Sequence, residues 1–149
     1  MSRLNLILAW VVVLAACDAR EAGSGAPGGG EGGTASVLVP TMQVRVEGDT
    51  VHFELQVSNA ADTAVVVEFG SAQRYDFAVE TEAGEPVWQW SADRMFGQVM
   101  GEERIEPGGS VRYREVWVPS ERSGRLVARG QVVSTSHPLE LRTLFEVGG

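Results

Sequence analysis

The sequence predicts an all-β protein, an immunoglobulin-like antiparallel β-sandwich of seven to eight strands. From Val37 onward, apolar and polar residues alternate with a period of two, as they do in half-buried strands. Turn signals recur about every 8–12 residues and no long helical pattern is present, which is typical of a sandwich. The single cysteine, Cys17, lies before this region, so we expect no disulfide between the sheets.

The clearest strand runs from Val51 to Val57, where Phe53 and Leu55 continue an apolar face and polar residues fill the other. Residues 42–46 alternate in the same way, and Gly48-Asp49 marks the turn between the two segments. Residues 91–108 are less regular, and a single helical turn around 95–100 is compatible with them. Further strands are expected at 65–69, 75–81, 87–90, 110–118, 125–134 and 139–147.

The first seventeen residues have the layout of a secretory signal. Arg3 supplies a positive charge, and the apolar run from Leu4 to Leu14 is shorter than the roughly 20 residues that cross a bilayer. The segment Leu14-Ala15-Ala16-Cys17 resembles the lipobox of bacterial lipoproteins, in which the cysteine is joined to diacylglycerol and the signal is cut just before it. The alternative is an ordinary secreted protein, but a lone cysteine in such a protein would lack a partner.

These features predict three regions. Residues 1–16 are expected to be a lipoprotein signal peptide, and 17–36 a lipidated Cys17 followed by a flexible glycine-rich tether. Residues 37–149 are expected to form the β-sandwich domain. The protein would be exported and anchored to the inner or the outer membrane of the cell envelope through lipid alone.

Composition excludes several classes of function. A net charge of −8 without a basic cluster argues against nucleic acid as a partner. His52 and His137 are isolated, so we expect no metal site, and no cofactor motif is present. Ser71 and Asp76 have no histidine placed between them, so we expect no catalytic residues and no enzyme. The acidic residues at 102, 103 and 106 are more typical of a solvated loop than of a calcium site. A protein partner is therefore expected.

Four segments of the chain follow one another in a characteristic order and spacing. They are Phe69-Gly70-Ser71-Ala72-Gln73-Arg74-Tyr75-Asp76-Phe77, Gly84-Glu85-Pro86-Val87-Trp88-Gln89-Trp90-Ser91, Met95-Phe96-Gly97-Gln98 and Pro107-Gly108-Gly109-Ser110. The pieces Gln-x-Tyr-Asp-Phe and Trp-x-Trp-Ser are the most specific. Together the segments resemble the BsuPI domain, the intracellular proteinase inhibitor family. The resemblance implies a compact β-sandwich that inhibits a serine proteinase of the subtilisin type by binding it.

The founding member of that family acts in the cytoplasm, whereas the signal predicts export. We therefore expect the proteinase partner, if inhibition is retained, at the cell envelope. The alternative is a non-inhibitory interaction or structural module of the envelope. An inhibitor needs the irregular 91–104 segment exposed and ordered, whereas a scaffold can bury it.

Two groups of residues are candidates for the site. The motif residues Tyr75, Asp76, Phe77, Trp88 and Trp90 are interpreted as structural, with the aromatic side chains in the core and Asp76 bonded to a nearby turn. The candidate partner-binding loop contains Arg94, Met95, Phe96 and Gln98. Its methionine and phenylalanine would suit an apolar specificity pocket, while the arginine is the alternative anchor for a basic preference. Phe96 could instead tuck under one end of the sandwich.

Overall fold

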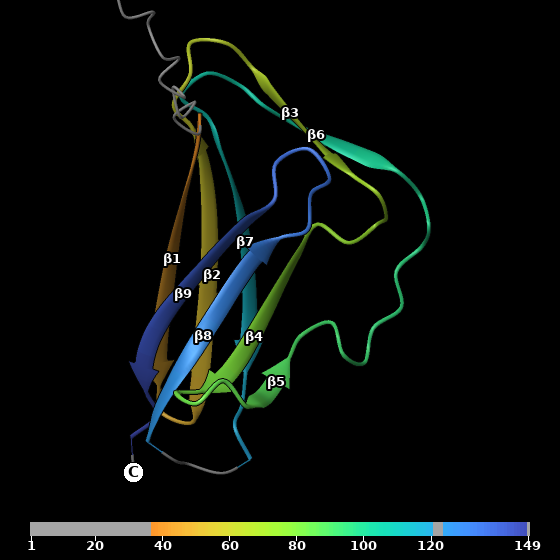
Figure 1. The fold of residues 1–149 in the computed structure, drawn as a ribbon. Helices are drawn as coiled ribbons and strands as arrows, with labels where there is room; N and C mark the ends of the chain where they lie inside the picture. The colour runs from red at the N-terminus through yellow and green to blue at the C-terminus, as the bar shows by residue number, and fades with distance from the viewer. Residues whose placement is uncertain (1–36, 121–123, 149) are drawn as a thin grey trace, which may run out of the picture. The chain divides into compact units, whose positions relative to one another are not determined.

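The computed structural model describes residues 37–120 and 124–148 (Figure 1). The expected signal peptide, Cys17 and tether lie outside the described residues. The described residues form no helix and nine strands, which confirms the all-β antiparallel class. None of them belongs to a helix with the length and hydropathy needed to cross a membrane. The strands are β1 (Leu38–Glu47), β2 (Thr50–Asn59), β3 (Val65–Phe69), β4 (Tyr75–Thr81), β5 (Pro86–Gln89), β6 (Gly101–Ile105), β7 (Ser110–Trp117), β8 (Arg125–Val132) and β9 (Leu139–Glu146).

Two sheets make the sandwich, and a short ribbon extends from it. One sheet has the order β1-β2-β7, the other has the order β5-β4-β8-β9, and β3 pairs with β6 alone. Figure 1 shows the two larger sheets lying over one another, with the β3–β6 ribbon beyond one end. Strands β1 and β9 contact each other along one side of the sandwich, so β7 and β5 border the opposite side.

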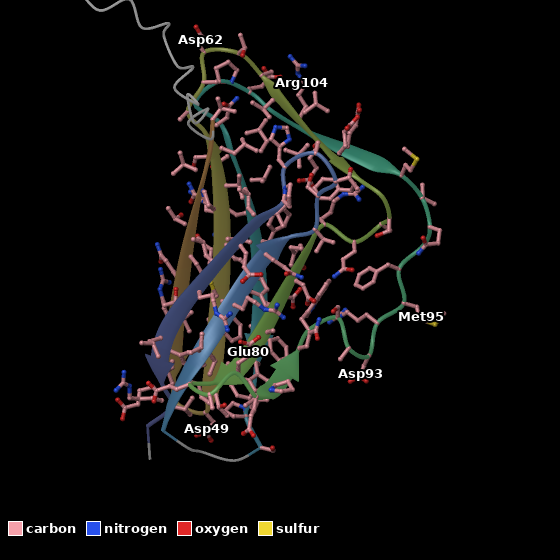
Figure 2. All side chains as sticks on the ribbon, viewed as in Figure 1. Asp49, Asp62, Glu80, Asp93, Met95 and Arg104 are labelled. Atoms are coloured by element: carbon pink, nitrogen blue, oxygen red, sulfur yellow. The ribbon has the colours of Figure 1, made fainter. Side chains whose placement is uncertain are left out.

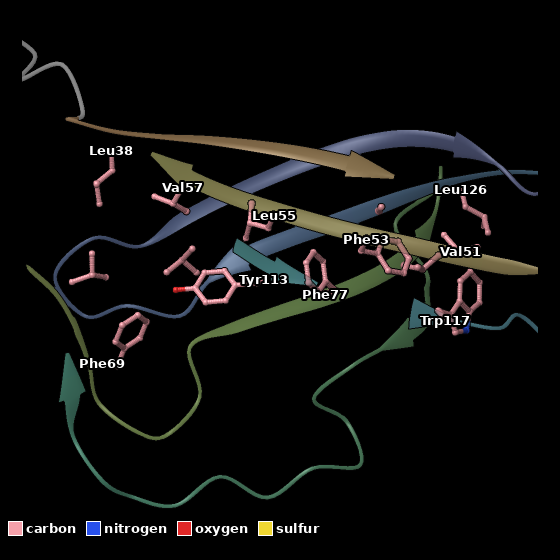
Figure 3. Packing of buried hydrophobic residues seen from close by; sticks show 14 of the residues in the cluster. Leu38, Val51, Phe53, Leu55, Val57, Phe69, Phe77, Tyr113, Trp117 and Leu126 are labelled. Carbon is pink, nitrogen blue, oxygen red and sulfur yellow. The ribbon is translucent and has the colours of Figure 1, made fainter. Parts of the chain in front are cut away.

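The core between the sheets is built on the alternation of β2. Residues 51, 53, 55 and 57 are each no more than 2% exposed, while their neighbours along the strand face outward. Phe53 stacks on Phe77 of β4 at 5.6 Å and on Trp88 of β5 at 5.7 Å, and it meets the edge of Phe145 of β9 at 6.2 Å. Figure 3 shows this ring among the buried side chains of both sheets. One residue of β2 thus joins three strands of the opposite sheet.

A buried asparagine fixes the end of β2. Asn59 is 1% exposed, and its amide nitrogen donates to the carbonyl oxygens of Thr63 and Ile105 at 2.8 and 2.9 Å. Its backbone N–H donates to the carbonyl of Gly109 at 2.9 Å, and its carbonyl accepts from Gly108. A buried amide is stable only when its polar atoms are paired, so these bonds hold the β6–β7 turn against β2.

Charged residues cover the outer faces of both sheets. On β2, Glu54 accepts a hydrogen bond from Arg114 of β7 at 2.6 Å, and this bond holds the pKa of Glu54 below its usual value. On β4, Glu80 contacts Arg129 and Arg142 of β8 and β9. Ion pairs on the surface of a protein add little stability, but these pairs keep each outer face polar.

Removal of the Phe53 ring should destabilise the sandwich strongly. We expect Phe53→Ala to lower the free energy of unfolding by about 3–5 kcal/mol, because it removes three aromatic contacts and leaves a cavity. The matched control is Val116→Ala on the outer face of β7, where the side chain is 51% exposed and the expected change is within about 0.5 kcal/mol. Guanidinium unfolding of both variants checks this, and equal stabilities would contradict the assignment of the core.

Candidate partner-binding loop

The candidate site is the loop at 90–100, which leaves β5 and enters β6. It carries the chain from the edge of the sandwich to the β3–β6 ribbon, and Figure 1 shows it running outside the strands. The structure has a turn at 90–93 and irregular chain from there to 100. The helical turn that the sequence allowed around 95–100 is not formed.

A buried carboxylate holds the beginning of the loop. Asp76 lies on β4 and is 3% exposed. Its Oδ2 accepts hydrogen bonds at 2.6 Å from Gln89 Nε2 and from Ser91 Oγ, and its Oδ1 accepts one at 3.1 Å from the backbone N–H of Ser91. Because three donors converge on one carboxylate, the chain direction after β5 is fixed at this point.

Four aromatic rings then connect the loop to the core. Tyr113 of β7 stacks on Tyr75 of β4 at 4.7 Å, and Tyr75 stacks on Trp90 at 4.6 Å. Trp90 in turn contacts Phe96 at 5.6 Å in a tilted arrangement. We call these four residues the aromatic stack. It places Phe96 half-buried against Trp90, and Phe96 is not part of the core between the sheets.

Further contacts hold the residues on either side of Met95. The guanidinium of Arg94 lies 4.3 Å above the Trp90 ring, and its Nε donates to the Trp90 carbonyl at 3.1 Å. The carbonyl of Gly97 accepts a hydrogen bond at 2.9 Å from the N–H of Ala72. Both neighbours of Met95 are therefore attached to the same indole, one through its cation and the other through its ring.

Met95 itself projects into solvent. Its side chain is 100% exposed, and Figure 2 shows it pointing away from the strands on the outer bend of the loop. The residues that follow are also open to solvent: Gln98 is exposed, Val99 is 68% exposed and Met100 is 83% exposed. A fully exposed methionine between two attached neighbours is the central geometric feature of the loop.

An arginine fixes the far end of the loop. The guanidinium of Arg74 lies 4.5 Å from the Phe69 ring centre and donates to the Ser71 carbonyl at 2.6 Å. It lies 3.8 Å from Glu103 of β6, which also accepts a hydrogen bond from Tyr113. A Cβ at Gly101 would collide with this guanidinium, so a larger residue where the loop enters β6 would require the Arg74 side chain to shift.

The remaining sequence candidates lie apart from this loop. Trp88 is partly buried against the core, where it stacks on Phe53 and on Trp117. His52 lies 3.8 Å from Glu47 with both side chains largely exposed on the outer face of the sheet, and His137 contacts the hydroxyl of Ser136. Across residues 37–120 and 124–148, no group of three histidine, cysteine or acidic side chains could hold a metal ion.

The fold and the loop define a class of protein: an antiparallel β-sandwich with one braced, exposed loop between β5 and β6. The family model described as BsuPI, intracellular proteinase inhibitor, matches residues 38–137. The chain therefore belongs to the BsuPI intracellular proteinase inhibitor family. This family is non-enzymatic, and an inhibitor implies a proteinase as its partner.

Three solved structures are similar to this chain at low sequence identity. A penta-heme cytochrome c552 from Thermochromatium tepidum has a TM-score of 0.47 and 9% identity, over 74% of this chain and 40% of the cytochrome. A target of the Northeast Structural Genomics Consortium has a TM-score of 0.43 and 11% identity, over 76% of this chain and 87% of the other. The sporulation control protein Spo0M from Bacillus subtilis has a TM-score of 0.42 and 9% identity, over 76% and 49%. This chain thus spans under half the length of the cytochrome and of Spo0M. No curated protein sequence matches it.

The two tyrosines of the stack should make the protein sensitive to alkali. Burial and hydrogen bonds to Glu115 and Glu103 raise the pKa values of Tyr75 and Tyr113, the only tyrosines in the chain, above the ordinary value. In the unfolded chain both ionise near pH 10, so the free energy of unfolding should fall as the pH rises beyond about 10. Parallel alkaline titrations by tyrosinate absorbance and circular dichroism should show ionisation only as the fold is lost. Ionisation of either tyrosine in a folded chain would contradict this account, and a Tyr75→Phe, Tyr113→Phe variant is the control.

Proposed function

We propose that this chain is an exported, lipid-anchored inhibitor of serine proteinases of the subtilisin type, and that Met95 is the residue that enters the specificity pocket. The observation that carries the proposal is the exposure of Met95 between two neighbours that are both attached to Trp90. An inhibitor that resembles a substrate must offer one side chain to the pocket while the chain around it stays fixed.

The contacts of the loop explain how it could bind a proteinase without being hydrolysed quickly. A flexible peptide loses conformational freedom when it enters a proteinase cleft, and this loss weakens its binding. Here Asp76 fixes the entry to the loop, while Trp90 holds both Arg94 and Phe96. After cleavage of the bond between residues 95 and 96, Phe96 would still lie on Trp90, so the new amino group would remain close to the acyl group and favour resealing.

The apolar side chain of Met95 indicates which kind of proteinase specificity pocket it would fit. Its side chain is unbranched and apolar, and it can adapt to an apolar pocket of irregular shape. Phe96 is turned toward Trp90, and the charge of Arg94 is placed over the same indole. Among these three consecutive residues, Met95 alone is free of such contacts, which favours a proteinase with an apolar preference over one with a basic preference.

The proposed location rests on the sequence. The lipobox-like segment ending at Cys17 and the lack of any second cysteine favour a lipid anchor at the cell envelope. The two or three acyl chains that such an anchor carries would hold the protein on a membrane stably. The proteinase partner would then lie on the same side of that membrane as the domain.

Substitution at Met95 should separate inhibition from folding. Met95→Asp should weaken inhibition of a subtilisin-type proteinase by at least about 100-fold, because it would bury a charge in an apolar pocket. Met95→Leu should inhibit nearly as well as the unmodified chain. Titration of proteinase activity against each purified protein gives the inhibition constants, and thermal unfolding should be unchanged in both variants.

Two results would contradict the proposal for Met95. One is equal inhibition by the Met95→Asp variant and the unmodified chain. The other is rapid degradation of the unmodified chain without inhibition across a panel of subtilisin-type proteinases, which would favour a non-inhibitory envelope module. Met100→Asp is the matched control, because Met100 is also exposed but lies at the far end of the loop.

Replacement of Cys17 tests the anchor. The Cys17→Ser chain lacks the thiol that would carry the lipid, so it should move from the membrane fraction to the soluble fraction when expressed in a bacterium. Fractionation followed by immunoblotting measures this shift. Continued membrane association of the serine variant would rule out anchoring through Cys17.

A further inference from the structure

The methionines of the described residues fall into two environments. Met95 is 100% exposed and Met100 is 83% exposed, whereas Met42 of β1 is packed against the core. The Met42 sulfur fills the space over Gly130 of β8, where an added Cβ would lie 3.0 Å from it. An oxidant in solvent can therefore reach the sulfur of Met95 freely, while Met42 is partly buried, with its sulfur beside Gly130.

We propose that Met95 is an oxidative modification site, and that its conversion to methionine sulfoxide by a hydroperoxide switches inhibition off. The proposal rests on the function proposed above for the same residue. In the reaction, the thioether sulfur attacks the terminal peroxide oxygen, an S–O bond forms and the O–O bond breaks. The sulfur is oxidised by two electrons, and the proton of the transferred oxygen passes to the departing hydroxide, so hydrogen peroxide is reduced to water.

The sulfoxide should leave the fold intact. Full exposure of Met95 means that its side chain makes no packing contact that the new oxygen could disturb. The bonds that shape the loop come from Arg94, Phe96 and Gly97, none of which involves the sulfur. The oxidised protein should therefore keep its loop conformation and its stability.

The same oxygen should prevent binding. A sulfoxide is polar and carries a strong hydrogen-bond acceptor, whereas the pocket inferred for Met95 is apolar. A polar group buried there without a partner should weaken inhibition by about 10- to 100-fold. Since enzymes reduce methionine sulfoxide back to methionine, the switch is reversible. Such a switch would release the proteinase under oxidising stress and restrain it again afterwards.

The test compares three forms of the purified chain before and after dilute hydrogen peroxide: unmodified, Met95→Leu and Met100→Leu. Peptide mass mapping measures the oxygen added at each methionine, and titration against a subtilisin-type proteinase gives the inhibition constant. We expect oxygen at Met95 well before Met42, and a 10- to 100-fold loss of inhibition in the unmodified and Met100→Leu chains. The Met95→Leu chain should inhibit equally before and after treatment, and reduction by methionine sulfoxide reductases should restore the unmodified chain.

The possible results distinguish failure of the oxidative switch from failure of the proposed inhibitory function. If the untreated chain does not inhibit, the proposed function fails and the switch fails with it. If the untreated chain inhibits and the fully oxidised Met95 inhibits equally well, the switch alone is overturned. Loss of inhibition in Met95→Leu but not in Met100→Leu after treatment would assign the effect to Met100 and also overturn the proposal. Circular dichroism of each treated sample shows whether any loss reflects unfolding, which would count against the switch.

Discussion

The stacking of Trp90 between Tyr75 and Phe96 is the contact on which the loop geometry depends. Tyr75 lies on the core-facing side of β4, so the indole of Trp90 holds the loop in a fixed position relative to the sandwich. A disulfide can brace an exposed loop, but this chain has a single cysteine, Cys17. Aromatic packing takes that role here, and the cation of Arg94 on the same ring adds to it.

This arrangement separates the residues that give stability from Met95, the residue proposed to contact a partner. Asp76 and Trp90 hold the loop against the sandwich, so substitutions of these residues would alter the shape of the loop. Met95 lies beyond these contacts and can change with little effect on folding. Specificity for different proteinases could therefore vary at one position while the sandwich stays the same. The same separation exposes the methionine sulfur to oxidants.

The sequence predicted the strands that show an alternation of apolar and polar residues along the chain. This alternation predicted β2, and the strand expected at 75–81 has the same bounds as β4. Strand β6 was not expected, because Gly101–Ile105 has a single buried apolar residue and pairs with β3 through backbone bonds that leave no sequence pattern. The burial of Asn59 was also missed, since its partners Thr63 and Ile105 are brought to it by the fold. The orientation of Phe96 stayed open for the same reason: spacing alone does not show that Trp90 lies beside it.

The most direct test of the account is to map where a subtilisin-type proteinase cuts the Trp90→Ala chain. We expect rapid cleavage between residues 95 and 96 together with loss of inhibition, because Arg94 and Phe96 no longer have the indole to hold them. Backbone amides of β2 and β8 should stay protected from hydrogen exchange, which shows that the sandwich is still folded. A folded Trp90→Ala chain that inhibits as well as the unmodified one, with the 95–96 bond intact, would contradict the claim that aromatic packing braces the binding loop.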